Sequence, residues 1–202
     1  MMKKWWAALL LLVSAWAMAD IQLGRDYTEL RTPQPAGSAG KVEVIEFFSY
    51  GCIHCYRLEP FVESWARKQP AHVSFRREQI VWDKSLEPLA RLFATQRQLG
   101  LLDKLHKPAF DAVMRDKQNL GDDKVLQPWL KAQGVDVATF MQTAQSFGMA
   151  SQVAKAAKMT RDYQVEGTPV FVVGGRYATM AAEPNRLLQV VDELVAKVKS
   201  GR

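Results

Sequence analysis

One stretch of the sequence decides the fold, and it reads Glu46-Phe47-Phe48-Ser49-Tyr50-Gly51-Cys52-Ile53-His54-Cys55-Tyr56. It ends an apolar run at 41–48 whose apolar residues point to both sides of an extended chain, as in a central strand covered on both faces. A helical pattern follows at about 52–68. Two cysteines separated by two residues are therefore predicted at the beginning of a helix that directly follows a buried strand.

The predicted helix at 52–68 has one apolar face and one irregularity. Its apolar side chains recur at helical spacing and include Cys55, Leu58, Phe61, Val62 and Trp65. Pro60 lies inside the helix and should kink it, because proline removes an amide donor and clashes with the preceding turn. The next strand is expected at 72–80, so that residues 41–80 form one βαβ unit.

Residues 84–163 change character, because helical patterns follow one another there without a β-rich run. Helices are expected at 86–99, 101–114, 125–132, 137–147 and 150–163, with glycine at the breaks Gly100, Gly121, Gly134 and Gly148. We therefore expect an all-helical insertion domain at 84–163.

The β pattern returns after the insertion. Two β-rich runs, 169–173 and 176–180, flank Gly174-Gly175, a pair that favours a two-residue hairpin because both glycines can adopt positive φ. A helix at 184–198 closes the chain. The order of elements predicts an α/β protein, βαβ…ββα around a central sheet. Its sheet domain is expected to comprise 41–83 and 164–202, preceded by an N-terminal arm at 20–40.

The first 19 residues have the build of a cleavable secretory signal. Lys3 and Lys4 form a positive region, residues 5–15 are nearly all apolar, and Ala17-Met18-Ala19 offers a cleavage site before Asp20. The alternative is a retained membrane anchor, but the apolar run is short of the ~20 residues that span hydrocarbon. We therefore expect a soluble, secreted protein.

The balance of charges argues against a nucleic-acid partner. The 202 residues carry 27 Lys and Arg against 21 Asp and Glu, a formal charge of +6, which falls to +4 without the two lysines of the signal. The basic residues are scattered among acids and form no dense patch of the kind that phosphate backbones demand. We expect no nucleic-acid partner, and a monomer.

The chain has only two cysteines, and a signal peptide would send them to an oxidising compartment. A zinc site would need further ligands, yet only His54, His72 and His106 are available, and His54 sits between the cysteines. A structural disulfide over so short a loop would stabilise by only about 2 kcal/mol. A redox switch suits this spacing, because thiol and disulfide interconvert with little movement and the second thiol resolves a mixed disulfide formed by the first.

The helix assigns different roles to the two cysteines. Cys52 is predicted to be the nucleophile, because the unsatisfied amides and the dipole of a helix N-terminus stabilise a thiolate. Cys55, one turn inside, is predicted to be the buried resolving thiol. His54 either adds a positive charge or a donor near the Cys52 sulfur, or is a solvent-facing loop histidine.

Glu46 is the next candidate catalytic residue. It lies six residues before Cys52, and counting in twos along the strand places it on a buried face, where an unpaired carboxylate would be costly. A buried acid beneath the dithiol could relay the proton when Cys55 attacks a mixed disulfide. The alternative is a glutamate that reaches solvent at the strand end. Glu59 either joins this site or is a solvated helical residue.

Two segments more than a hundred residues apart together carry a family resemblance. The stretch at 46–56 and the segment Val165-Glu166-Gly167-Thr168-Pro169-Val170-Phe171 resemble the two active-site segments of the DsbA family of periplasmic disulfide oxidases. The interrupting helical domain is also DsbA-like, and Pro60 matches the kinking proline of thioredoxin-like helices. The resemblance implies a thioredoxin-like fold in which Thr168-Pro169 is a cis-proline loop that faces the dithiol and binds extended substrate backbone.

The sequence departs from the family pattern at two positions. Ile53 stands where the family usually has proline between the cysteines, and Thr168 stands where it usually has valine. In this superfamily both positions tune redox potential and substrate release. The resemblance therefore places Ile53, Thr168 and Pro169 at the substrate-binding surface and leaves the redox potential open.

The resemblance implies a periplasmic thiol–disulfide oxidoreductase that donates a Cys52–Cys55 disulfide to newly translocated proteins with free thiols. A DsbB-like, quinone-linked membrane oxidase would reoxidise it, without a bound organic cofactor or metal. One alternative is a reductase on the same fold; an isomerase with a separate dimerisation domain would not fit the short arm at 20–40. The other alternative is a metal-delivery protein. Copper sites favour Met near the thiols, however, and no Met adjoins this motif.

Overall fold

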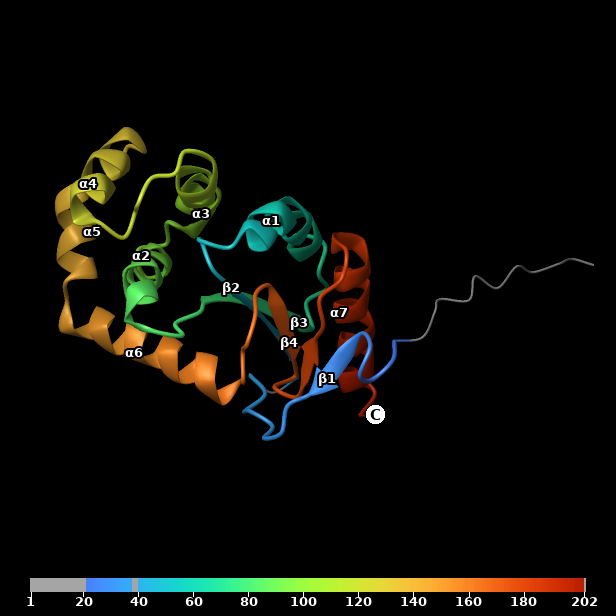
Figure 1. The fold of residues 1–202 in the computed structure, drawn as a ribbon. Helices are drawn as coiled ribbons and strands as arrows, with labels where there is room; N and C mark the ends of the chain where they lie inside the picture. The colour runs from blue at the N-terminus through green and yellow to red at the C-terminus, as the bar shows by residue number, and fades with distance from the viewer. Residues whose placement is uncertain (1–20, 38–39, 202) are drawn as a thin grey trace, which may run out of the picture.

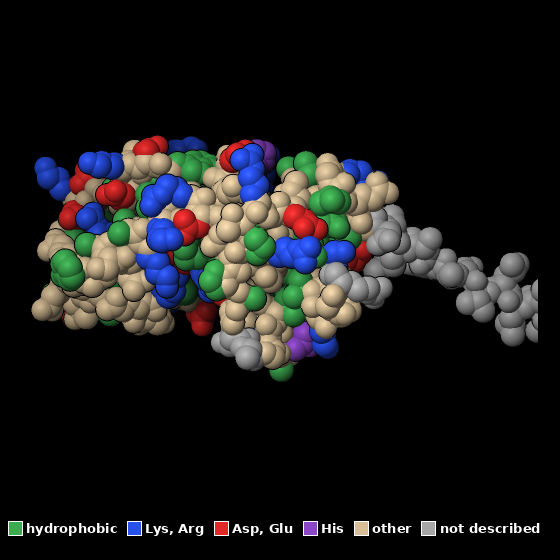
Figure 2. All heavy atoms as spheres, turned by 90° about the horizontal axis from the view of Figure 1, so that it is seen from below, with side chains coloured by type: hydrophobic (Ala, Val, Ile, Leu, Met, Phe, Trp, Pro, Cys, Tyr) green, Lys and Arg blue, Asp and Glu red, His purple; other side chains and the backbone are tan. Residues whose placement is uncertain are grey.

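The computed structural model describes residues 21–37 and 40–201, so the predicted signal at 1–19 lies outside the described residues. Figure 1 shows a central sheet with two helices along one side and a group of helices at one end. Within the described part of the chain, no helix combines the length and the hydropathy that crossing a membrane requires. On the face drawn in Figure 2, acidic side chains lie among the basic ones.

The sheet has five strands in the order β1-β5-β4-β2-β3. In chain order the strands are β1 (Tyr27–Glu29), β2 (Val42–Phe48), β3 (Val73–Gln79), β4 (Val170–Val173) and β5 (Tyr177–Thr179). Strand β2 pairs with β3 in parallel and with β4 in antiparallel orientation. The sheet is therefore mixed, with the predicted βαβ unit on one side of β2 and the C-terminal hairpin on the other.

Strand β2 is buried on both faces, as its apolar run predicts. Val44 packs towards α1 (Ile53–Ala66) and α7 (Pro184–Lys199), which lie along one face of the sheet. Ile45 and Phe47 pack on the other face against the end of α6 (Phe147–Asp162). Because β-branched and aromatic side chains fill both faces, the chain leaving β2 is held rigidly where α1 begins.

The helical insertion runs from α2 to α6, between β3 and β4. After a short 3₁₀ turn, Lys84–Leu86, its elements are α2 (Glu87–Gln98), α3 (Leu102–Phe110), the π turn Asp111–Arg115, α4 (Asp123–Ala132), α5 (Val137–Ala144) and α6. Its apolar core is continuous with the end of β2, because Phe48, Tyr50 and Cys55 pack with Phe93 and Phe110. The insertion therefore supplies part of the wall around the dithiol.

Three helical details differ from the sequence prediction. The break between α5 and α6 falls at Ser146, whose side chain caps α6 by accepting from the Met149 amide, and Gly148 lies inside the helix. In α1, Phe61 is 42% exposed. Glu59 takes the place in the buried stripe that the sequence predicts for Phe61, because polar partners from β3 and α3 reach its carboxylate.

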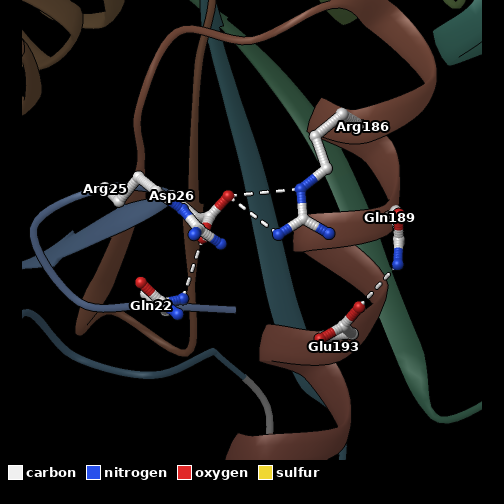
Figure 3. A network of polar contacts seen from close by, with 6 residues as sticks. All are labelled: Gln22, Arg25, Asp26, Arg186, Gln189 and Glu193. Carbon is white, nitrogen blue, oxygen red and sulfur yellow. Dashed lines mark hydrogen bonds and ion pairs between the residues drawn. The ribbon is translucent and has the colours of Figure 1, made fainter. Parts of the chain in front are cut away.

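The N-terminal arm contains a strand that the sequence pattern does not reveal. Strand β1 pairs with β5, Tyr27 opposite Thr179, and the Tyr27 ring meets the Tyr177 ring edge-on at 5.6 Å between centroids. Three residues are too few to give a recognisable alternation. Figure 3 shows the polar contacts that fasten this arm to α7: Asp26 accepts from the Gln22 amide and from Arg186, contacts that lower the Asp26 pKa to about 2.

The β4–β5 connection is one residue longer than predicted, because β5 begins at Tyr177. Gly174 and Gly175 both have positive φ, as expected, and Arg176 completes a three-residue turn. Gly175 also binds the N-terminal arm, because its backbone carbonyl accepts a hydrogen bond from the Gln34 backbone amide at 2.7 Å. A Cβ on Gly175 would lie 2.3 Å from the Gln34 carbonyl oxygen. Glycine is therefore required here for two reasons: the positive φ and the close approach of the arm.

Candidate active site

Cys52 is the N-cap residue of α1, where the chain passes from the sheet into the helix. Its backbone is extended, with φ −98° and ψ 117°, and its Sγ accepts from the Cys55 amide at 3.4 Å. Cys55 is 1% exposed, whereas Cys52 is only partly buried. The helix start thus presents one sulfur to solvent and keeps the other inside.

The surroundings make the two thiols unequal in acidity. The pKa of Cys52 is lowered to about 5, above all because the Cys55 thiol donates to its sulfur, while burial opposes this. The Thr168 side chain and the backbone amides of Cys55 and His54 lower it further. The pKa of Cys55 is raised far above its ordinary value, because Cys55 donates that bond and is buried. At neutral pH the reduced site therefore holds one thiolate and one thiol.

The loop before β4 lies against Cys52, although 116 residues separate them in sequence. The Thr168–Pro169 peptide bond is cis, and the Cys52 Sγ lies 3.3 Å from the Thr168 carbonyl oxygen. Trp82, at the other end of the insertion, donates its indole Nε1–H to the Val165 carbonyl at 2.6 Å. Trp82 thus ties the two connections of the insertion together; the sequence offers no signal for this contact.

An open groove of about 1150 Å³ begins at this loop and continues along the sheet edge. Its lining includes Thr168, Pro169, His54, Arg57 and Met180. The His54 side chain is exposed there, and its contribution to the Cys52 pKa comes through its backbone amide. Ile53 is 38% exposed beside the sulfur. The four residues at 52–55 therefore present one sulfur, one apolar and one imidazole side chain to the surface.

Glu46 lies on the face of β2 that packs against α1, and its side chain is 1% exposed. Arg77 stands beside it on β3, with Nε 3.2 Å from Glu46 Oε2, and donates from Nη2 to Glu59 Oε1 at 2.8 Å. Burial raises the pKa of both acids, with Arg77 opposing. The charge of Glu46 also raises the Cys55 pKa, so this acid cluster acts electrically on the inner thiol.

The insertion reaches the same cluster through His106 of α3. His106 Nε2 lies 3.4 Å from Glu59 Oε2, and its Nδ1 lies 2.8 Å from the Tyr50 hydroxyl. Sequence reasoning considered His106 only as a zinc ligand, and it missed Arg77. Strand register could have found Arg77, because Glu46 and Arg77 are paired positions on the parallel strands. No local pattern could have brought His106 to the site, since packing of the insertion places it there.

Comparison with known proteins gives a consistent result. The family model of the DSBA-like thioredoxin domain matches residues 43–194. The thiol:disulfide interchange protein DsbA of Azotobacter vinelandii is 38% identical over 187 residues, covering 91% of this chain and 87% of the relative. The protein of the same name from Pseudomonas aeruginosa strain PAO1 is 34% identical over 200 residues, covering 96% and 95%.

Solved structures agree with the sequence relatives. The crystal structure of Pseudomonas aeruginosa DsbA superposes with a TM-score of 0.84 at 34% identity, covering 88% of this chain and 94% of that one. The oxidoreductase NmDsbA1 of N. meningitidis gives 0.83 at 33% identity, covering 91% and 96%. The fold, the cysteine pair at a helix start and these relatives together lead to one assignment: the chain belongs to the family of DsbA-like thioredoxin domains and is a thiol:disulfide oxidoreductase.

Proposed function

We propose that the protein works as an oxidant, passing a Cys52–Cys55 disulfide to pairs of thiols in extended polypeptides. The unequal acidity of the two thiols carries this proposal, because the pKa of Cys52 is about 5 while that of Cys55 is raised. A thiolate of low basicity is a good leaving group and a stable product. The reduced pair is thereby favoured, and its disulfide readily accepts electrons.

The proposed reaction runs through one mixed disulfide. A substrate thiolate attacks Cys52 Sγ, the Cys52–Cys55 bond breaks, and Cys55 leaves with the electron pair and takes up a proton. A second thiolate of the same substrate then attacks the substrate sulfur, and Cys52 leaves as a thiolate. The substrate is oxidised by two electrons as it gains a disulfide, and the Cys52–Cys55 pair is reduced by two.

The remaining site residues are proposed to serve these steps. Glu46 relays the proton to or from Cys55, supported by its burial and its effect on the Cys55 pKa. Thr168 and Pro169 hold the substrate backbone beside Cys52, supported by the 3.3 Å contact of the sulfur with the Thr168 carbonyl oxygen. Ile53 and His54 contact the substrate at the surface, and the groove that begins there receives the extended chain.

Location, partners and division of the chain complete the proposal. Residues 1–19 direct the protein to the periplasm, 41–83 with 164–202 form the thioredoxin-like domain, and 84–163 form the insertion domain. Newly translocated proteins with free thiols are the substrates, and a DsbB-like, quinone-linked membrane protein restores the disulfide. The relatives named for thiol:disulfide interchange support the assignment of thiol-bearing substrates.

Equilibration of the purified protein with glutathione redox buffers at neutral pH tests the direction of the reaction. We expect a potential well above that of thioredoxin, about −270 mV, and towards the strongly oxidising end near about −120 mV. A value near that of thioredoxin would support a reductase instead. Metal analysis of the reduced protein addresses the metal-delivery alternative, since stoichiometric copper or zinc would contradict the proposal.

A further inference from the structure

His106 is a buried histidine for which the proposed reaction has so far no use. Its side chain is 7% exposed and sits among the rings of Phe48, Tyr50, Phe93 and Phe110. It comes from α3 of the insertion, whereas the acids it approaches belong to the sheet domain. An apolar side chain would fill this aromatic box, so the two ring nitrogens of His106 need an explanation.

The hydrogen bonds around Tyr50 determine which nitrogen carries the proton. The Tyr50 hydroxyl donates its proton to Gln96 Oε1 at 3.0 Å. A hydroxyl has only one proton, so at 2.8 Å from His106 Nδ1 it must accept. Nδ1 of His106 is therefore protonated, and in the neutral imidazole Nε2 is left with a lone pair.

That lone pair faces Glu59. Nε2 of His106 lies 3.4 Å from Glu59 Oε2, and the other oxygen, Oε1, is bound to Arg77. A carboxylate oxygen and a bare ring nitrogen would repel each other, so a proton belongs between them. Burial, together with the nearby charge of Arg77, lowers the His106 pKa and so favours the neutral imidazole, while the charge of Glu63 opposes this shift. A proton on Glu59 Oε2 would give His106 Nε2, which is buried without a hydrogen-bond partner, a donor at this distance.

The balance of charges in the cluster agrees with this placement. Glu46 and Glu59 share a single counter-charge, Arg77, in a space where unpaired charge is costly. With one of the two acids protonated, Arg77 balances the charge of the other and the cluster is neutral. With both acids ionised, one net negative charge would lie beneath Cys55 and disfavour its thiolate.

We propose that His106 is a positioning residue for thiol–disulfide interchange, which accepts the proton of Glu59 and so keeps the acid cluster beneath Cys55 electrically neutral. Through the imidazole of His106, the insertion then controls how readily the Cys55 thiol ionises. The effect on the reaction rests on the proposed role of Cys55 as the resolving thiol. The location of the proton does not rest on it.

Infrared spectroscopy of the full-length reduced protein tests the location of the proton. A protonated buried carboxylic acid gives a carbonyl band that is separate from the carboxylate bands, and Glu59→Gln and Glu46→Gln assign the bands to their residues. We expect a Glu59 acid band near neutral pH whose titration midpoint falls by about one pH unit in His106→Phe, because the acid loses its acceptor. His106→Gln should restore the midpoint, since its amide oxygen can accept from Glu59 while its amide nitrogen donates to Tyr50.

A second readout separates this proposal from a purely structural role. The rate at which Cys55 resolves a mixed disulfide should fall in His106→Phe with its pH profile displaced by the same amount, and it should recover in His106→Gln. Nitrogen chemical shifts of His106 in the wild-type protein provide the measurement that needs no variant. A proton on Nε2 across the neutral range, or a Glu59 band that His106→Phe leaves in place, would overturn the proposal. A correct band with unchanged resolution rates would refute only the proposed link to Cys55.

Discussion

Glu46 and Arg77 stand opposite each other on the parallel strands β2 and β3, and Arg77 Nε lies 3.2 Å from Glu46 Oε2 in a space closed to solvent. The same guanidinium donates to Glu59 at 2.8 Å, so one positive charge serves two buried acids. The register of a strand pair thus fixes the charge beneath Cys55.

Glu46→Gln should slow the step in which Cys55 attacks a mixed disulfide by about 100-fold, because general acid–base catalysis typically contributes that much or more. Stopped-flow measurement of mixed-disulfide decay gives the rate. Unfolding titrations should show no loss of stability near neutral pH. A raised folded-state pKa makes the ionised Glu46 increasingly unfavourable as pH rises above its unfolded value, ~4.3, and glutamine removes that dependence. A variant that is destabilised but equally fast would contradict the relay.

Cys55→Ala should trap substrates on Cys52, because the variant keeps the exposed sulfur and loses the one that resolves the adduct. Reductant-sensitive adducts with a model polypeptide that carries a disulfide would appear on non-reducing gels, because the Cys52 thiolate attacks that disulfide and displaces one of its sulfurs. Cys52→Ala is the matched control and should give few adducts, since the remaining thiol is 1% exposed and its pKa is raised. Trapping by the Cys52 variant alone would reverse the two roles.

Thr168→Val should raise the pKa of Cys52 by about one unit, because the side-chain hydrogen bond that Thr168 supplies to the sulfur is lost at nearly constant shape. Titration of thiolate absorbance in the ultraviolet measures it. The exposed Thr139→Val on α5 is the control and should leave the titration unchanged. An unaltered pKa in Thr168→Val would show that Cys55 and the backbone amides account for the effect alone.

The stability of the reduced form relative to the oxidised form should depend on pH. The folded-state pKa of Cys52, about 5, lies below its ordinary value of 9.0, so the gain is complete above pH 9.0 and disappears as pH falls through about 5. Near pH 7 it amounts to about 2 kcal/mol after allowance for the partial exposure of Cys52, equivalent to about 40 mV. Denaturant unfolding of both forms at about pH 7 and about pH 4.5 measures the difference. An advantage of the reduced form that grows on acidification would contradict thiolate stabilisation.

Gly175→Ala should destabilise the fold by more than about 1–2 kcal/mol, the cost of positive φ alone, because its Cβ would also collide with the Gln34 carbonyl oxygen. Gly24→Ala provides the matched control, since Gly24 has φ +83° and open space around its Cβ position. The difference between the two free energies of unfolding reports the packing of the arm on the β4–β5 turn. Equal losses would mean that the arm moves aside freely.

The sheet and the dithiol helix could be predicted because their signals are local. Strand β2 is a continuous apolar run, α1 has a helical stripe, and Gly174-Gly175 marks a turn. Strand β1 was not predicted, because three residues are too few to show an alternating pattern. The prediction that Phe61 lies on the buried face of α1 was wrong, because a stripe defined by apolar residues leaves out a buried acid such as Glu59.

The site was only half predictable, since half of it is assembled by tertiary contacts. The cysteines and Glu46 could be placed by counting along a strand and a helix. Arg77 enters by strand register and His106 by the packing of α3, and neither position has a sequence signal of its own. Thr168 and Pro169 were found by resemblance alone, because a proline before a strand does not reveal which residue 116 positions earlier it will face.

The order of strands in the sheet also dictates when the protein can become active during synthesis. The first two strands to emerge, β1 and β2, are not neighbours, and the gap between them belongs to β5 and β4, the last two strands made. In a chain that crosses a membrane from its N-terminus, the sheet therefore stays incomplete between β1 and β2 until about the final thirty residues emerge. The loop that contacts the Cys52 sulfur arrives with those strands, so a half-delivered chain holds a thiol that is not yet fully acidic. Delayed closure of the sheet thereby postpones the full acidity of Cys52 until nearly the whole chain has been delivered.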